Sequence, residues 1–490
     1  MFKELKALSR ETLIYGLSTV MGRLLNFFLL PLYTHALSPA DYGIVATLFS
    51  YLAFLNVLYG YGISFAFMRY YKTEEKLSGA EVFSTAFWSV LITSLVFSFF
   101  LIGQSAWISR IAQIPDRSLI LISAGILAFD ALALTPFARL RMNHRAGLYV
   151  GLKIINIALN IVLSYVFLVT LKKGVGGVFW AGLISSFLTF VLILPFSWAE
   201  LRLKFSSGIW TRLLRFGLPL LPAGLSAMMV QVIDRPILKF MTNDAAVGIY
   251  QANYRLGIFM MMVVNMFDSA WRPFFLQRGY RPDSRNLFAR ILTYFAVGGS
   301  IIFLGITFFI AYLVMPRVFG GKSLIPSVYW AGLSLVPVVT LGYLFDGIYI
   351  NFLAPVTLAE KSEYVAYAAA LGAAVNVGTN LLWIPRWGMM GAAFATLAAY
   401  ASMAAFLFLL GRRLYPVPYE WKRLLHLSGI VALILVLAHS LGIGVNEGRL
   451  GLRVVLLLLF PATLYLTGFF NEEEKRTFKK LANFLSQLHI

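Results

Sequence analysis

The chain contains no cysteine and few charged residues. Of its 490 residues 13% are charged, whereas a soluble domain carries about 25%. The absence of cysteine excludes disulfide bonds and thiolate chemistry. The five histidines are scattered and lack the spacing of metal ligands, so we expect no metal site and no bound cofactor.

Ten-residue segments of alternating polarity, which are typical of membrane β-barrels, are also missing. Hydrophobic residues make up 60% of the chain and fall in long blocks between short charged stretches. A block of about 20 apolar residues crosses the hydrocarbon layer as a helix, which satisfies its own backbone polar groups. The sequence therefore predicts an all-α polytopic membrane protein with about 14 transmembrane helices.

Each apolar block gives one expected transmembrane span. The expected bounds are 12–34, 43–68, 82–104, 118–138, 148–170, 175–197, 213–233, 247–270, 291–313, 327–350, 363–384, 388–410, 424–442 and 451–470. Residues 1–11 are charged and amphipathic and have no short apolar region before a cleavage site. We therefore expect an interfacial segment there and no removable signal peptide. Residues 471–490 place Phe478 and Leu481 opposite Lys475 and Lys479, which predicts an amphipathic tail on the membrane surface.

The net charge of +20 is spread over many short loops, so it does not indicate a nucleic-acid-binding domain. Most of the 41 Lys and Arg residues fall on one side of the predicted topology. That side includes Arg139, Arg141, Arg145, Arg281 and Arg412, and the opposite side has few basic residues, such as Lys172. The positive-inside rule then places both termini in the cytoplasm, and we expect a bacterial cytoplasmic (inner) membrane.

The two halves of the chain resemble each other weakly. Ser38-Pro39-Ala40-Asp41-Tyr42-Gly43-Ile44 is echoed by Thr242-Asn243-Asp244-Ala245-Ala246-Val247-Gly248-Ile249-Tyr250, and Asn156 and Asn160 are echoed by Asn376 and Asn380. An even number of spans per repeat gives two parallel copies, whose interface is a common place for a transport site. This organisation predicts an N-terminal lobe (12–210), a C-terminal lobe (211–415) and two helices outside the repeat (416–470).

Several short motifs are spread over the two halves of the chain. They are Tyr15-Gly16-Leu17-Ser18, Leu30-Pro31-Leu32-Tyr33, Leu37-Ser38-Pro39-Ala40-Asp41-Tyr42-Gly43, Phe216-Gly217-Leu218-Pro219-Leu220-Leu221-Pro222, Asp234-Arg235, Val247-Gly248-Ile249-Tyr250 and Trp271-Arg272-Pro273-Phe274. With these motifs the chain resembles the polysaccharide transporters and O-antigen flippases of the multidrug/oligosaccharidyl-lipid/polysaccharide exporter superfamily.

This resemblance implies two six-helix lobes that face each other in a V, followed by two trailing helices, with alternating access to a central cavity. The implied cargo is an undecaprenyl-diphosphate-linked oligosaccharide for the synthesis of polysaccharide such as the O-antigen of lipopolysaccharide. The implied partners are membrane lipids and a polysaccharide polymerase or chain-length machinery. The implied role is transport, so we expect no enzymatic activity.

Charged residues within the spans predict the cargo site, because a charge at mid-span costs about 2.5–3.5 kcal/mol and normally faces protein or water. The candidates for substrate binding lie in polar stripes on three helices: Arg23 and Asn26; Lys153, Asn156 and Asn160; Gln251 and Arg255. Arginine and amides suit a diphosphate attached to a sugar. The alternatives are a structural pairing of Arg23 with Asp130, snorkelling of Lys153, and asparagines that only bond neighbouring helices.

Two acidic residues within the spans, Asp130 and Asp346, are candidates for ion coupling, to Na⁺ or H⁺, unless the membrane potential acts on the arginines directly. A solvated structural role is the alternative for Asp346. We interpret Asp234-Arg235, at a helix end, as a local ion pair.

Two other functions remain open. One is a cation-coupled multidrug antiporter of the same superfamily, although the first span offers Arg23 and no carboxylate for a cationic drug. The other is a peptidoglycan-precursor lipid flippase, which the sequence hardly distinguishes from the main interpretation. A membrane glycosyl polymerase or ligase is disfavoured, because no long outer loop carries a cluster of carboxylates and histidines.

The orientation can be tested directly because the chain has no native cysteine. We expect a single cysteine at Arg281 or Arg412 to resist an impermeant thiol reagent applied to intact cells, and one at Lys172 to react. Labelling of the Arg281 or Arg412 variants from outside would reverse the predicted topology.

Overall fold

A computed structural model describes residues 21–22, 24–71, 78–316, 321, 323–443, 449–472 and 474–476. Every regular element in these ranges is a helix. Arg23, the interfacial segment at 1–11 and most of the amphipathic tail predicted at 471–490 lie outside the described residues. The predictions made for them therefore stay predictions.

The described residues of the N-terminal lobe form eight α-helices and a π-helical turn. They are α2 (Leu29–Ala36), α3 (Pro39–Gly60), α4 (Ile63–Tyr70), α5 (Gly79–Gly103), α6 (Ser105–Ile111), α7 (Ser118–Met142), α8 (Ala146–Tyr165) with the π-turn Val166–Thr170, and α9 (Gly174–Ile193). Two helices then lead to the second lobe: α10 (Ser207–Gly217) and α11 (Leu221–Val232).

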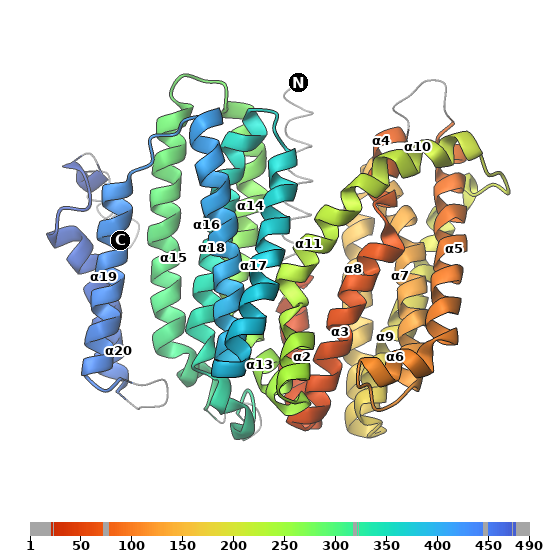
Figure 1. Ribbon diagram of the computed structural model, residues 1–490, viewed down its shortest axis with the longest axis horizontal. Helices are drawn as coiled ribbons and strands as arrows, with labels where there is room; N and C mark the ends of the chain where they lie inside the picture. The colour runs from red at the N-terminus through yellow and green to blue at the C-terminus, as the bar shows by residue number, and fades with distance from the viewer. Residues whose placement is uncertain are drawn as a thin grey trace, which may run out of the picture.

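The C-terminal lobe follows the same plan. Its helices are α12 (Asp234–Met241), α13 (Asp244–Leu256), α14 (Ile258–Arg278), α15 (Ser284–Val314), α16 (Leu335–Leu358), α17 (Glu363–Trp387) and α18 (Met389–Leu414). The last two helices, α19 (Trp421–Ser440) and α20 (Leu450–Leu466), pack against α15 at the outer side of this lobe (Figure 1).

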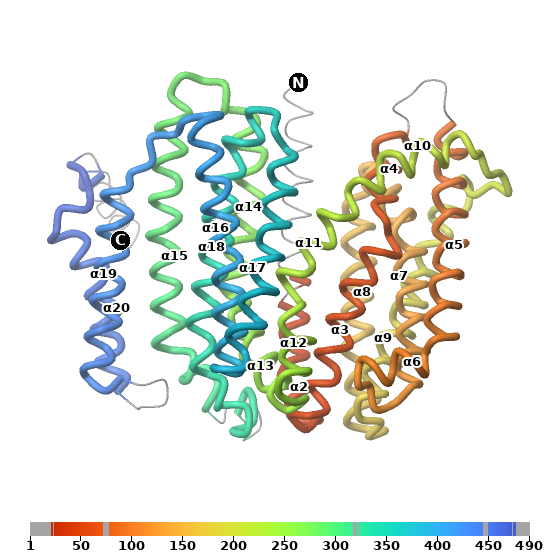
Figure 2. The backbone as a smooth tube through the Cα atoms, in the orientation of Figure 1, coloured from red at the N-terminus to blue at the C-terminus, as the bar shows by residue number. Residues whose placement is uncertain are grey.

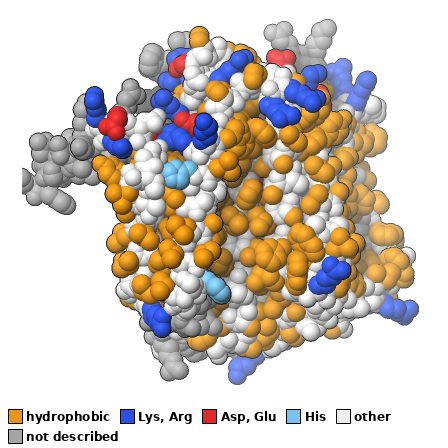
Figure 3. All heavy atoms as spheres, turned by 60° about the vertical axis from the view of Figure 1, so that its left-hand side comes forward, with side chains coloured by type: hydrophobic (Ala, Val, Ile, Leu, Met, Phe, Trp, Pro, Cys, Tyr) orange, Lys and Arg blue, Asp and Glu red, His pale blue; other side chains and the backbone are white. Residues whose placement is uncertain are grey.

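The expected all-α polytopic fold is confirmed. Among the described residues, eleven helices are long and apolar enough to cross a membrane. The shorter apolar helices Leu24–Ala36 and Leu450–Leu466 overlap the first and last expected spans, and residues 12–20 of the first lie outside the described residues. The eighth span is formed by α13 and α14 together, which adjoin at Gly257. Figure 3 shows the resulting apolar band between two ends where Lys and Arg side chains gather.

The lobes lean together at one end and apart at the other (Figures 1 and 2). At the lower end of Figure 1, which we call the joined end, α2 and α3 meet α12 and α13. At the upper end, which we call the basic end, α7, α14 and α18 finish in Arg141, Arg278 and Arg412–Arg413. The lobes therefore form a V that opens toward the basic end.

Helices α3 and α13 start at the joined end with equivalent caps. The Ser38 hydroxyl accepts a bond from the Asp41 amide at 3.1 Å, and the Asn243 side chain accepts one from the Ala246 amide at 2.9 Å. These caps satisfy backbone donors that a helix N-terminus leaves free. The two halves of the sequence repeat thus start the same helix in each lobe.

Two glycines let these helices touch backbone to backbone. A Cβ built on Gly43 would lie 1.7 Å from the carbonyl oxygen of Asp244, and one on Gly248 would lie 1.9 Å from that of Pro39. The two contacts are equivalent under the repeat, so each lobe supplies one glycine and one carbonyl. Any larger residue at either position would push the lobes apart.

Polar side chains bridge the same end. The Lys239 ammonium donates to the Gln113 carbonyl at 2.8 Å and pairs with Asp244 at 3.0 Å, although the Lys239 side chain is only 2% exposed. The Tyr329 hydroxyl donates to the Leu37 carbonyl at 3.2 Å. Because these groups are buried, separating the lobes here would leave them without partners.

We expect Gly43→Ala to destabilise the protein, because overpacking of a filled interior costs about 1–3 kcal/mol. The melting temperature of the purified protein in detergent should fall. Gly298→Ala is the matched control, since a Cβ at Gly298 in α15 meets nothing within 4 Å. Equal melting temperatures for the two variants would contradict the close crossing of α3 and α13.

Candidate substrate-binding site

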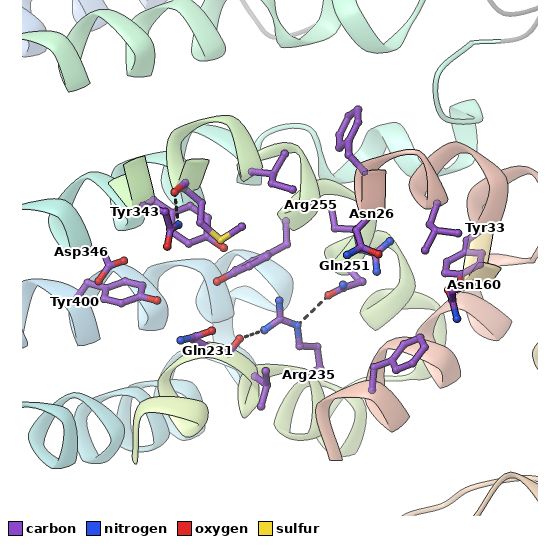
Figure 4. A pocket seen from close by; sticks show the side chains of 18 residues that line it. Asn26, Tyr33, Asn160, Gln231, Arg235, Gln251, Arg255, Tyr343, Asp346 and Tyr400 are labelled. Atoms are coloured by element: carbon purple, nitrogen blue, oxygen red, sulfur yellow. Dashed lines mark hydrogen bonds between the residues drawn. The ribbon is translucent and has the colours of Figure 1, made fainter. Parts of the chain in front are cut away.

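A cavity of about 550 Å³ lies between the lobes. Helices α2, α3 and α8 form one wall, and α11 to α14, α16 and α18 form the other. Figure 4 shows the side chains that line it. The polar members are Asn26, Tyr33, Asn160, Gln231, Arg235, Gln251, Tyr254, Arg255, Asn265, Tyr343, Asp346 and Tyr400. The cavity thus holds two guanidinium groups, one carboxylate and many uncharged donors and acceptors.

Arg255 is the cation with unused hydrogen-bonding capacity. Its guanidinium lies over the ring of Tyr33, 5.9 Å from the ring centroid. Its Nη1 atom is buried and finds no hydrogen-bond partner among the described residues, and none of their carboxylates forms an ion pair with it. A buried guanidinium normally has its donors satisfied, so this arrangement suits an anionic ligand.

The Tyr33 ring that supports Arg255 is itself held by the N-terminal lobe. Its hydroxyl lies 3.3 Å from the Ser164 hydroxyl of α8. Because Tyr33 comes from α2 and Arg255 from α13, the contact also spans the two lobes. The position of this guanidinium therefore depends on how the lobes are arranged.

Arg235 differs from Arg255 because protein groups already satisfy it. It pairs with Asp234 at 2.6 Å, donates to Gln251 at 3.0 Å and bonds the Gln231 carbonyl. Its guanidinium also lies 4.2 Å from the centroid of the Tyr254 ring. The Asp234–Arg235 ion pair expected from the sequence is present, and it is buried at the cavity wall. Its first role is structural.

The structure brings together five of the residues predicted from the sequence. Asn26, Asn160, Gln251, Arg255 and Asp346 all line the central cavity. Asn160 also donates to the Ser185 hydroxyl at 3.2 Å. The stripes on three helices therefore converge on one space.

Three other predicted residues lie apart, in a second cavity of about 480 Å³ inside the N-terminal lobe. They are Asp130, Lys153 and Asn156. The Lys153 ammonium is 4.3 Å from the centroid of the Phe137 ring, and Asn156 donates to Thr189 at 2.7 Å. Asp130 lies within interaction range of Lys153 and Ser186. Since Arg23 is outside the described residues, its proposed pairing with Asp130 stays a prediction.

Sequence reasoning missed the tyrosines of the cavity. Tyr254, Tyr343 and Tyr400 come from three different helices, so no single helical stripe reveals them. One signal was available: Tyr343 lies three residues before Asp346 and therefore on the same helical face. The described residues contain no group of three His, Cys, Asp or Glu side chains that could hold a metal ion.

Comparisons with known proteins agree with this geometry. Residues 34–275 match the family model described as polysaccharide biosynthesis protein. The lipid II flippase MurJ in its inward closed conformation is similar in structure, with a TM-score of 0.75 at 17% identity over 93% of this chain and 99% of that chain. No curated protein matches by sequence at a significant level.

Two transporters of the MOP superfamily are also similar. The inward-facing conformation of a multidrug resistance MATE family transporter gives a TM-score of 0.64 at 17% identity, over 80% of this chain and 97% of that chain. A MOP-superfamily transporter from Pyrococcus furiosus, described as having a binding pocket of reverse polarity, gives a TM-score of 0.59 at 15% identity. The match covers 83% of this chain and 95% of that chain.

The fold, with a cavity between two equivalent lobes, is the one seen in the solved structures of the lipid II flippase MurJ and of the MATE transporter. The segment that matches the model of the polysaccharide biosynthesis protein family, residues 34–275, makes up a little less than half of the chain. Both findings agree with the resemblance that the sequence motifs carry.

The two arginines should respond differently to the same substitution. Arg235→Gln leaves the buried Asp234 without its partner, and breaking a buried pair costs about 3–5 kcal/mol. We therefore expect a clearly lower melting temperature in detergent. Arg255→Gln removes no ion pair, so its melting temperature should stay near that of the native protein. A lower melting temperature for Arg255→Gln than for Arg235→Gln would contradict the roles assigned to the two residues.

Proposed function

We propose that the protein flips an undecaprenyl-diphosphate-linked oligosaccharide across the bacterial cytoplasmic membrane by alternating access, for polysaccharide biosynthesis. The observation that carries this proposal is the unsatisfied guanidinium of Arg255 in the cavity between the lobes. A diphosphate offers several anionic oxygens to such a group, and arginine binds phosphate oxygens through two parallel bonds.

The uncompensated cation in the cavity favours an anionic cargo. Asp234 neutralises Arg235, so the charged groups that a ligand meets are the guanidinium of Arg255 and, at the other end, the carboxylate of Asp346. A cationic drug would meet the guanidinium of Arg255, so the multidrug antiporter alternative is less favoured. The abundant amides and tyrosine hydroxyls suit a saccharide that follows the diphosphate.

The peptidoglycan-precursor alternative rests on the similarity of this fold to the lipid II flippase MurJ. The match to the polysaccharide biosynthesis family favours a polysaccharide precursor over it. Both cargoes are lipid-linked, and the diphosphate end of the cavity would serve either one. An O-antigen unit of lipopolysaccharide is the cargo that we favour.

Alternating access requires the joined end to open while the basic end closes. We place the basic end in the cytoplasm, so the V of the structure is ready to load cargo from inside. Energy for the reset comes from Na⁺, H⁺ or the membrane potential, since moving one charge across 100 mV is worth about 2.3 kcal/mol. Asp130, beside Lys153 in the second cavity, is the residue we propose for ion exchange.

The proposal predicts that Arg255→Gln abolishes complementation of a flippase-null strain at normal membrane abundance. Arg255→Lys should restore only part of the activity, because lysine keeps the charge and loses the planar fork. Arg290→Gln on α15, away from the cavity lining, is the control and should complement fully. Full complementation by Arg255→Gln would contradict a diphosphate site at this residue.

Reconstitution of the same variants in liposomes adds the driving force to this test. Flipping of the lipid-linked oligosaccharide should accelerate when one of the Na⁺, H⁺ or potential gradients is imposed alone. If none of the three gradients changes the flipping rate, the coupled mechanism is wrong and the flipping is driven by the cargo gradient alone.

A further inference from the structure

The central cavity has two chemically different ends. At one end Arg255 lies near Asn26, Tyr33 and Asn160, and at the other end Asp346 and Tyr400 lie near Tyr343 (Figure 4). Arg235, already paired with Asp234, lies between them. A ligand that fills the cavity therefore meets an unsatisfied cation at one end and a carboxylate at the other.

A row of tyrosine rings connects the middle of the cavity to the carboxylate. The ring centroids of Tyr254 and Tyr343 are 5.9 Å apart with the rings edge to face, and those of Tyr343 and Tyr400 are 6.4 Å apart. Such pairs hold each other's orientation. The row therefore gives this end of the cavity a rigid wall of aromatic rings that carry phenol hydroxyls.

The Tyr400 hydroxyl is available to a ligand. The side chain is largely buried, with 5% relative exposure, yet it lines the cavity. The Tyr400 hydroxyl makes no hydrogen bond with any described residue. In Figure 4 it points from α18 toward the interior of the cavity. The hydroxyl is reachable from the cavity and can donate to or accept from a polar ligand beside it.

Two further groups complete this end. Asp346 on α16 contributes a carboxylate that can only accept hydrogen bonds, through about four lone-pair sites. Gln231 on α11 contributes an exposed amide whose side chain bonds no described residue. An acceptor, an amide and a phenol together match the hydroxyl and acetamido groups of a sugar, which donate as well as accept.

From these observations we propose that Asp346, Tyr400 and Gln231 form a saccharide subsite, which selects a sugar without negative charge next to the diphosphate. This inference rests on the proposed function, because Arg255 fixes the diphosphate at the opposite end. A uronic acid at this position would bring its carboxylate toward that of Asp346. Juxtaposed like charges cost several kcal/mol, so the carboxylate acts against the wrong cargo.

The test measures binding of three probes to the full-length protein in detergent by native mass spectrometry. The probes are undecaprenyl diphosphate without sugar, the same lipid with one N-acetylglucosamine, and the same lipid with one glucuronic acid. The native protein should bind the N-acetylglucosamine form most tightly. It should bind the glucuronic acid form at least about tenfold more weakly.

Tyr400→Phe keeps the ring and removes the hydroxyl. It should lower the affinity for the N-acetylglucosamine form about fivefold, which is the effect of losing one neutral hydrogen bond. The affinity for undecaprenyl diphosphate should stay unchanged. Tyr165→Phe is the matched control, since Tyr165 in α8 is 54% exposed and does not line the cavity; none of its affinities should change. The subsite is overturned if Tyr400→Phe weakens the binding of the N-acetylglucosamine form and of undecaprenyl diphosphate equally. It is also overturned if the variant weakens the binding of neither.

Asp346→Asn removes the charge and should raise the affinity for the glucuronic acid form to that of the N-acetylglucosamine form. Unchanged discrimination in this variant overturns the role of Asp346 in selectivity. Arg255→Gln separates the two proposals, because it should weaken all three probes. If Arg255→Gln bound undecaprenyl diphosphate as tightly as the native protein, the diphosphate site would fail, whatever the outcome at Tyr400.

Discussion

The whole structure depends on the backbone contact between α3 and α13. Gly43 and Gly248 bring each helix against a carbonyl of the other, with less space than a single methyl group requires. This contact, together with the buried Lys239 bridge, holds the lobes at the joined end and makes them diverge toward the basic end. The central cavity exists because the lobes are fixed at one end only.

The same contact explains why the site lies where it does. Arg255 sits on α13, about two turns beyond Gly248 of the glycine crossing, and reaches the ring of Tyr33 from the opposite lobe. The lobes are close enough there for one side chain to touch both, and far enough apart to leave a cavity. A change in the angle between the lobes would therefore change the surroundings of Arg255 directly, which links cargo binding to the conformation.

The cavity also illustrates how buried charges divide their roles. Arg235 and Arg255 face the same space, but Asp234 and Gln251 satisfy the first, and no described residue does so for the Nη1 atom of the second. In a low-dielectric interior, a compensated charge stabilises the fold and an uncompensated one is available to a ligand. The difference depends on one neighbouring carboxylate. For Arg235 it is Asp234, the residue directly before it on the chain, and for Arg255 the described part of the chain supplies none.

Much of the fold follows from the sequence alone. The lengths of the apolar blocks set the number of spans, because the bilayer leaves a helix no other way to satisfy its backbone. The repeated Ser38 and Asn243 segments indicated two equivalent lobes, since the same capping chemistry starts α3 and α13. The polar stripes on three helices identified Asn26, Asn160, Gln251 and Arg255, which do line one cavity. Helical periodicity shows which face a residue occupies, and a polar face within lipid must turn inward.

Only the tertiary structure decided which of these faces meet. Lys153, Asn156 and Asp130 carry the same polar signal as Asn160, but they line a separate cavity, because α7 and α9 close around that part of α8. Tyr254, Tyr343 and Tyr400 form one wall although 146 residues separate the first from the last in the chain. Periodicity within a helix carries no information about distances between helices. Those distances were set by the glycine contact and the packing around it, and they determine the site.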